Sequence, residues 1–123
     1  MRGWRALPVW PLTCSQSGIA IHAFAAQSLV ARLRGLLGTQ QPPGPSEALL
    51  LMPASSIHTV GMRYPITVLY LDAGFRVIRR HDAVAPGRWL RAPRRGHACL
   101  EMAADAPLAL SPGSVLKRQE VLD

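Results

Sequence analysis

The chain has 123 residues, of which 49% are hydrophobic, and a formal net charge of +7. This length is typical of one domain, and the hydrophobic fraction excludes a disordered chain and provides a core that needs neither a metal nor a disulfide for stability. Eleven prolines and ten glycines favour short strands joined by tight turns over a bundle of long helices.

The sequence carries no pattern typical of export or of a membrane span. Pro8 and Pro11 interrupt the only apolar run that follows Arg2 and Arg5, so we expect no signal peptide and a cytoplasmic protein. No apolar run approaches the roughly 18 residues of a membrane-spanning helix. The basic charge comes from thirteen arginines and one lysine, and it attracts anionic partners without implying specificity.

The N-terminal part of the chain predicts extended structure. Residues 1–18 are expected to form an extension or an edge strand ahead of a single domain over residues 19–123. Prolines within the extended piece Trp4–Leu12 place it at a sheet edge. Ile19–Phe24 is apolar and too short for a stable helix, which favours a strand.

Ala25–Leu37 has the pattern of an amphipathic helix. Its apolar residues recur at helical spacing and predict one buried stripe. They are Leu29, Val30, Leu33 and Leu37. The proline-rich run at residues 41–46 cannot continue a helix, so the helix ends before it.

The clearest local signal is a β-hairpin. Ile66–Leu71 and Phe75–Arg79 predict two paired strands, and the turn between them is expected to use Gly74 at positive φ. The apolar run Glu47–Met52, which ends before Pro53, predicts a further buried strand.

The C-terminal third predicts two more strands after a long loop. Residues 83–96 contain prolines, glycines and four arginines around Trp89, which indicates an exposed connection. Strands are expected at Ala98–Met102 and from Val115 to about Val121. Six to eight strands and one helix do not alternate as parallel β-α-β units would. The predicted fold is mainly β: an antiparallel, jelly-roll-like β-sandwich or a small barrel with one covering helix.

Three segments read together resemble one family. They are Arg32–Leu37, then Ile57–Ile66 leading into Leu69–Asp72, then Leu100–Met102, and the second contains the motif His-Thr-x-Gly-Met-Arg-x-Pro-Ile. In this order and spacing they resemble the domain-of-unknown-function family 192 (DUF192) over roughly residues 19–122. The resemblance implies a compact all-β fold of the jelly-roll kind, found mostly in bacteria and archaea, with no established activity, cofactor or catalytic residue.

The chain departs from the family pattern at two positions. Thr67 follows the Pro-Ile pair where many relatives carry aspartate, and a glycine that many relatives have near Asp105 is absent. A family function that used this aspartate would be missing from this chain.

His58 is the first candidate for chemistry. It lies beside Thr59 and shortly before Arg63, and the ordinary pKa of histidine suits a general base or a ligand to an acidic group. The alternative is a structural histidine packed under the loop, because relatives often carry tryptophan at this position.

Glu101 is the second candidate. On a predicted strand it points to the same side as Cys99 and away from Leu100 and Met102, as a buried acid paired with an arginine. A glycosidase-like pair with Asp72 is a further alternative, set against a turn-capping role for that aspartate.

The cysteines and histidines give no sign of a metal site. Cys14 and Cys99 are expected to be buried free thiols rather than a disulfide. Only His97 and Cys99 are close in sequence, and their spacing is tighter than in structural zinc sites, so we expect no metal and no cofactor.

Arg88–Arg95 surrounds Trp89 with arginines, a mixture that can stack a base and neutralise phosphates. A solvated basic loop with Trp89 packed against the sheet is the alternative.

Three functions remain open from the sequence. The first is a non-catalytic binding module for a small molecule, polysaccharide or protein, and the missing catalytic signature favours it. Its candidate ligand-binding residues are His58, Thr59, Arg63, Trp89 and Glu101. The second is an enzyme that acts on a small anionic substrate through His58, and the third is nucleic-acid binding by Arg88–Arg95.

Overall fold

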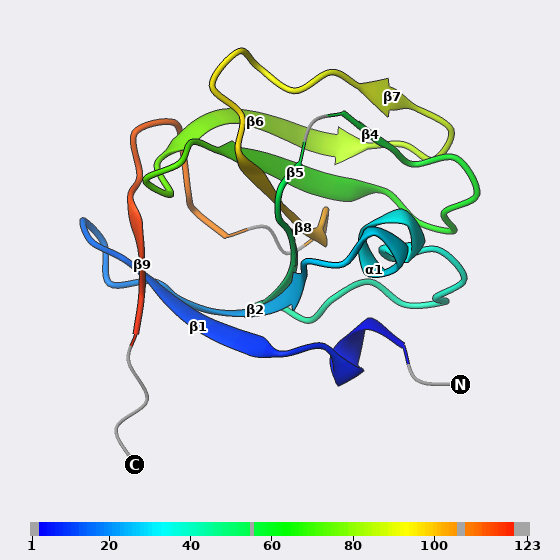
Figure 1. Cartoon of the computed structure of the whole chain (residues 1–123), viewed down its shortest axis with the longest axis horizontal. Coiled ribbons are helices and arrows are strands. Elements are labelled where there is room, and N and C mark those ends of the chain that lie inside the picture. Colours follow the sequence, from blue (N-terminus) through cyan, green and yellow to red (C-terminus); the bar gives the residue numbers. More distant parts are fainter. Residues whose placement is uncertain (1–2, 55, 106–107, 120–123) are drawn as a thin grey trace.

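The computed structural model describes residues 3–54, 56–105 and 108–119 (Figure 1). In chain order the elements are the 3₁₀-helix η1 (Trp4–Ala6), β1 (Val9–Cys14), β2 (Ala20–Ala26), α1 (Leu29–Arg34), β3 (Glu47–Leu51), β4 (Ile57–His58), β5 (Ile66–Leu71), β6 (Val77–Val84), β7 (Trp89–Leu90), β8 (Ala98–Ala103) and β9 (Leu116–Arg118). Within this part of the chain no helix is long and apolar enough to cross a membrane.

Across the described residues, seven strands form one sheet in the order β6-β5-β8-β3-β2-β1-β9, and β4 and β7 form a separate two-stranded ribbon. The large sheet curls into a half-barrel, and α1 lies at one end of it, between the layer of β1 and β2 and the layer of β5 and β6 (Figure 1). The predicted mainly β fold with a covering helix is confirmed.

One strand pair departs from the antiparallel arrangement that the sequence predicts. β2 and β3 are parallel, with Phe24 opposite Leu49, whereas the neighbouring pairs β1–β2 and β3–β8 are antiparallel. The chain leaves β2 at Ala26, forms α1 and returns to begin β3 at Glu47. Parallel neighbours require a crossover of this kind. The expectation that the chain contains no β-α-β unit is therefore wrong.

The central strands β3, β5 and β8 are buried on both faces. On β8, Cys99 packs in one hydrophobic cluster with Tyr70, and Leu100 and Met102 pack in a second cluster on the other face. Because side chains alternate along a strand, Glu101 points to the face of Cys99, as predicted. The first cluster also includes residues of β4 and of the segment after α1, so these elements cover the face to which Glu101 points.

The predicted hairpin is confirmed as β5 and β6, but its turn differs. Gly74 does not adopt a positive φ, whereas Phe75 does, at 60°. The Asp72 carboxylate accepts hydrogen bonds from the backbone N–H groups of Gly74 and Arg76, each at 2.9 Å. This side-chain cap fixes the turn so that the left-handed residue comes one position later than predicted, and it confirms the turn-capping role of Asp72.

The predicted helix over residues 25–37 is shorter, and its stripe is not buried. β2 continues through Ala26 by pairing with β3, Ser28 caps the helix by accepting from Ala31 N–H at 3.1 Å, and Gly35 ends it with φ +46°. Three residues of the predicted stripe are exposed, whereas Leu36 is buried. The exposed fractions are 62% for Leu29, 74% for Val30 and 64% for Leu33.

The remaining predicted segments are shorter or placed differently. The Trp4–Leu12 piece divides into η1 and β1, and β9 pairs with the end of β1, so β1 is not the edge strand of the sheet. Residues 83–96 contain the end of β6 and the short β7. The last strand ends at Arg118, and the residues beyond 119 that were predicted as strand lie outside the described part. Cys14 and Cys99 are buried and free, as expected.

Candidate ligand-binding site

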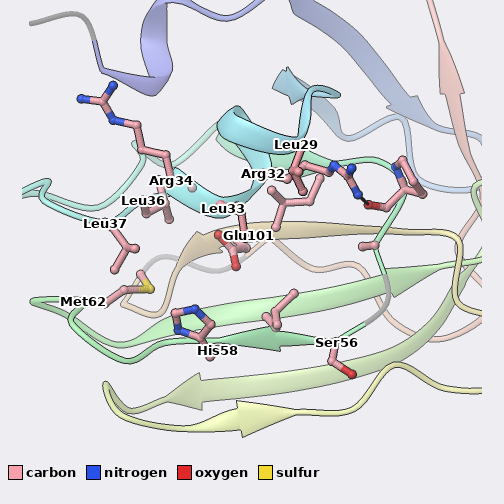
Figure 2. A pocket seen from close by; sticks show the side chains of 15 residues that line it. Leu29, Arg32, Leu33, Arg34, Leu36, Leu37, Ser56, His58, Met62 and Glu101 are labelled. Atoms are coloured by element: carbon pink, nitrogen blue, oxygen red, sulfur yellow. Dashed lines mark hydrogen bonds between the residues drawn. The ribbon is translucent and has the colours of Figure 1, made fainter.

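A pocket of about 230 Å³ opens where α1 and the segment after it face β4 and β8 (Figure 2). Much of its wall is apolar, with Leu33, Leu36, Leu37, Ile57 and Met62 among the lining residues. Arg32, His58 and Glu101 are among its polar lining residues. The pocket is thus an apolar cavity into which a few polar groups converge, which is the usual composition of a small-molecule site.

The acidic group of the pocket, Glu101, is buried in the middle of the sheet. Only 4% of the residue is exposed, and its neighbours across the strands are the apolar Leu49 and Val68. Burial raises the pKa of Glu101 to about 7. Among the described residues, none donates a hydrogen bond to its carboxylate or forms an ion pair with it.

The predicted pairing of Glu101 with an arginine is therefore wrong within the described part of the chain. Arg32, one of the two arginines that line the pocket, donates from Nη1 to the Pro53 carbonyl at 3.1 Å, and its guanidinium is directed away from Glu101 (Figure 2). Its Nε is buried and has no partner in the residues described. Burial causes the raised pKa of Glu101, which agrees with the lack of an ion pair to Glu101 within the described residues.

Titratable neighbours of Glu101 on its own face are held neutral. Burial raises the pKa of the Cys99 thiol well above its ordinary value, and the charge of Glu101 adds to the effect. Burial likewise raises the pKa of Tyr70 and of Tyr64, with a further contribution from Glu101. Cys99 is consequently a buried thiol rather than a nucleophile.

His58 reaches the same pocket from β4. Its ring lies on the side of the pocket facing Glu101 (Figure 2), and its Nδ1 is buried without a partner in the described part of the chain. Its other neighbour is Trp89, opposite it on β7, with ring centroids 4.9 Å apart. Ser56, two residues earlier, points away from His58 (Figure 2), so these two do not form a nucleophile–base pair.

Thr59, Arg63 and Trp89, the other three sequence-predicted site residues, do not line the pocket. Thr59 is fully buried; its hydroxyl donates to the Ala85 carbonyl at 2.7 Å and accepts from the Arg88 N–H at 2.9 Å. Arg63 is exposed. Trp89 is 71% exposed, so the expectation that it packs against the sheet is wrong.

Other groups singled out in the sequence lie elsewhere. Asp72 caps the β5–β6 turn, so it does not form a catalytic carboxylate pair with Glu101. Thr67 pairs with Met102 and belongs to the face opposite Glu101. The described residues contain no group of three or more histidine, cysteine, aspartate or glutamate side chains that could hold a metal ion.

The family model DUF192, described as "Uncharacterized ACR", matches residues 12–117. The chain belongs to the DUF192 family. No match to a curated protein was found.

Two solved structures share the fold of this DUF192 protein. A protein of unknown function from Novosphingobium aromaticivorans DSM 12444 is 20% identical, with a TM-score of 0.79 over 90% of this chain and 86% of that chain. A Sinorhizobium meliloti 1021 protein described as a "putative transcription regulator" is 17% identical, with a TM-score of 0.80 over 91% of this chain and 95% of that chain. At these identities the likeness concerns the fold alone.

The three segments that carry the DUF192 resemblance meet at the pocket. Arg32–Leu37 forms one wall, Ile57, His58 and Met62 form another, and Glu101 projects between them. Sequence reasoning missed Arg32, Leu36 and Met62 as site residues. The resemblance itself could have identified them. Its three segments are far apart in the chain, and a shared pocket is a physical reason for them to occur together.

Proposed function

We propose that this DUF192 protein is a binding module for a small organic molecule, which the Glu101 pocket holds. The observation that carries the proposal is a carboxyl group that is buried in an apolar sheet, lines an open pocket and has no partner among the described residues. Burying an ionisable group without a partner destabilises a fold by several kcal/mol. The apolar neighbours Leu49 and Val68 indicate that the sheet itself does not need an acid here.

Two residues that line the pocket with Glu101 each carry a buried polar atom without a partner in the described residues. His58 Nδ1 and Arg32 Nε are buried and unpartnered in the part of the chain that is described. Buried polar atoms in folded proteins nearly always have a hydrogen-bond partner, which is either protein, water or a ligand. A ligand whose binding shifts these two side chains would supply partners that the described residues do not.

The size of the pocket favours a small molecule over a polysaccharide chain or a protein segment. Its volume is about 230 Å³, which at about 30 Å³ for a water-sized group accommodates roughly eight non-hydrogen atoms. The ligand is therefore expected to carry a compact apolar part against Leu36 and Met62 and one polar end near Glu101.

An NMR titration with 1-hexanol as an uncharged probe tests this function. Hexanol is expected to shift the amide signals of α1, β4 and β8 at millimolar concentration. Leu33→Trp, which places a large ring at the pocket from an exposed position, is expected to weaken this binding at least tenfold. Val9→Trp, at an exposed position on β1, is the matched control. Shifts scattered over the surface, or equal binding by both variants, would contradict a role for this pocket.

Nucleic-acid binding is the second candidate, and one observation favours it. Trp89 is 71% exposed, and Arg88 and Arg91 beside it are exposed as well. An aromatic ring between guanidinium groups suits stacking on an unpaired base. The name of the Sinorhizobium meliloti protein points in the same direction, although that protein shares only the fold with this chain.

This second candidate predicts an electrophoretic shift of single-stranded oligonucleotides at low salt. Stacking is worth about 1–3 kcal/mol per base, so Trp89→Ala is expected to weaken binding about tenfold. Val60→Ala removes an exposed apolar side chain outside this loop and is the control. The absence of any shift at low salt would remove nucleic acid from consideration.

A further inference from the structure

We infer that the ligand of this pocket is an organic cation: a small primary or secondary amine whose ammonium group pairs with the Glu101 carboxylate. Its apolar part packs against Leu36 and Met62. The inference rests on the proposed function, because it specifies the chemistry of the molecule that the same pocket would bind.

The first argument is the missing counter-charge. The ion pairs within the described residues are Arg5–Glu47 and Arg80–Asp82, and neither involves Glu101. Arg32 is turned towards the Pro53 carbonyl. Carboxylates are almost never buried unless they are paired. An ammonium ion in the pocket provides the partner that the described residues do not supply.

The second argument concerns His58, the polar residue on the pocket wall that faces Glu101. His58 Nδ1 lies on the facing wall and has no partner in the described part (Figure 2). In the neutral ring tautomer that carries its proton on Nε2, Nδ1 is an acceptor. This nitrogen has almost no accessible surface, so a small rotation of the His58 ring has to expose it before an ammonium group bound to the carboxylate can also donate to it.

The ionisation of Glu101 changes the charge of the pocket near neutral pH, because its pKa is about 7. The titratable and charged residues on the elements packed against it come from five elements and the segment before β5. They are Arg32 and the exposed Arg34 from α1, Glu47 from β3, which is paired with Arg5, His58 from β4, Tyr64 before β5, Tyr70 from β5 and Cys99 from β8. Burial raises the pKa of Cys99, Tyr64 and Tyr70, which keeps them neutral below their ordinary pKa values. The ionised form of Glu101, which a cation requires, predominates only above its pKa of about 7.

The net charge of +7 does not oppose a cationic ligand strongly. Two arginines line the pocket: Arg34 is exposed, and Arg32 donates to the Pro53 carbonyl. The remaining arginines, such as Arg63, are farther away, and charges in water are screened over about 8 Å at physiological ionic strength. Inside the pocket the local carboxylate acts at short range in a low-dielectric surrounding, where its attraction is several times stronger than in water.

The opposite ligand class, an organic anion, would require a protonated Glu101 that donates to it. Above the pKa of about 7, Glu101 is ionised and repels an anion. Binding of an anion would therefore weaken as pH rises. The two classes therefore predict opposite pH dependence, which separates them in one experiment.

The test compares hexylamine, hexanol and hexanoate, which share the same apolar chain, by NMR titration at about pH 6 and about pH 8. Hexylamine is expected to bind more tightly than hexanol. Because the ionised fraction of Glu101 rises from about one tenth to about nine tenths over this range, its affinity is expected to be about tenfold higher at the upper pH. Hexanol binding is expected to stay constant.

Matched variants locate the effect. Glu101→Gln removes the carboxylate at nearly constant shape, and it is expected to abolish both the preference for hexylamine and its pH dependence. Glu47→Gln makes the same change at a carboxylate outside the pocket and is expected to leave both unchanged. Retention of the preference in Glu101→Gln would overturn the inference.

The remaining outcomes separate this inference from the proposed function. Tighter binding of hexanoate than of hexylamine, or hexylamine binding no tighter than hexanol, would overturn the cationic ligand while hexanol binding in the pocket still supports a binding module. Failure of all three probes to shift the signals of the pocket would overturn both.

Discussion

Replacing Glu101 with glutamine is expected to raise the free energy of unfolding at about pH 8 by about 3 kcal/mol. In the folded protein burial raises the pKa of Glu101 from its ordinary value of 4.5 to about 7. Between these two values the folded chain binds more protons than the unfolded chain, so stability falls as pH rises. Below pH 4.5 the carboxyl is protonated in both states, and above pH 7 the loss is complete. Glutamine stays neutral throughout and avoids the loss.

Urea denaturation between about pH 5 and pH 8 measures this effect. The wild-type midpoint is expected to fall with rising pH, the Glu101→Gln midpoint is expected to stay more nearly level, and the two curves are expected to approach each other near pH 5. Glu47→Gln is the control, and its effect on the free energy of unfolding is expected to have the opposite sign. The reason is that the hydrogen bond from Arg5 lowers the pKa of Glu47. That carboxylate stabilises the fold above its ordinary pKa, and the stability is lost as pH falls. A wild-type midpoint independent of pH would contradict the burial of an unpaired acid.

A residue whose removal stabilises the fold is one that the fold does not need. Positions of this kind are concentrated at functional sites, where groups are held in unfavourable surroundings for the sake of binding or chemistry. The stability measurement therefore bears on the proposed function without requiring knowledge of the ligand.

The sequence predicted best those elements whose signal is local. The alternation over Ile66–Leu71 followed by Asp72 and Gly74 led to the correct hairpin, because strand pairing across a short turn depends on adjacent residues. The parallel pairing of β2 with β3 was missed, since it joins segments separated by α1 and a long loop and leaves no local pattern. The position of the left-handed residue at Phe75 depended on side-chain hydrogen bonds of Asp72 that composition alone does not give.

The helix shows why apolar periodicity does not determine burial. Leu29, Val30 and Leu33 recur as a buried stripe would, yet they are exposed. Ala31 and Leu36 pack against the core instead. Periodicity identifies one apolar face, but which neighbour covers that face depends on tertiary packing.

The candidate site was predicted only in part, because the sequence shows which residues could do chemistry but not which of them meet in one pocket. His58 and Glu101 were chosen for their chemistry, and both line the pocket. Thr59 was chosen from the same motif, although its hydroxyl is fully used by the loop at residues 85–88. Arg32 was missed because an arginine on a short amphipathic helix looks like a solvated charge. A buried polar residue that is satisfied and one that is left unsatisfied look alike in a sequence, and only their partners distinguish them.

Replacing Thr59 with valine is expected to lower the free energy of unfolding by about 2 kcal/mol. The Thr59 hydroxyl donates to the Ala85 carbonyl at 2.7 Å and accepts from the Arg88 N–H at 2.9 Å, and the residue is fully buried. Valine keeps the shape but leaves both backbone groups without their partner. Urea denaturation measures the loss. Thr59→Ser retains the hydroxyl and is expected to lose only about 1 kcal/mol, from one buried methyl group.

The same substitution at Thr67 provides the matched control, because this residue is equally buried while its hydroxyl has no partner in the described part of the chain. Thr67→Val removes an unsatisfied polar atom from an apolar strand, so it is expected to be neutral or stabilising. Two threonines of equal burial are therefore expected to respond differently to the same substitution, because the hydroxyl of one is hydrogen-bonded and that of the other has no partner among the described residues. A loss in Thr67→Val as large as in Thr59→Val would show that the hydrogen bonds to residues 85 and 88 do not determine the effect.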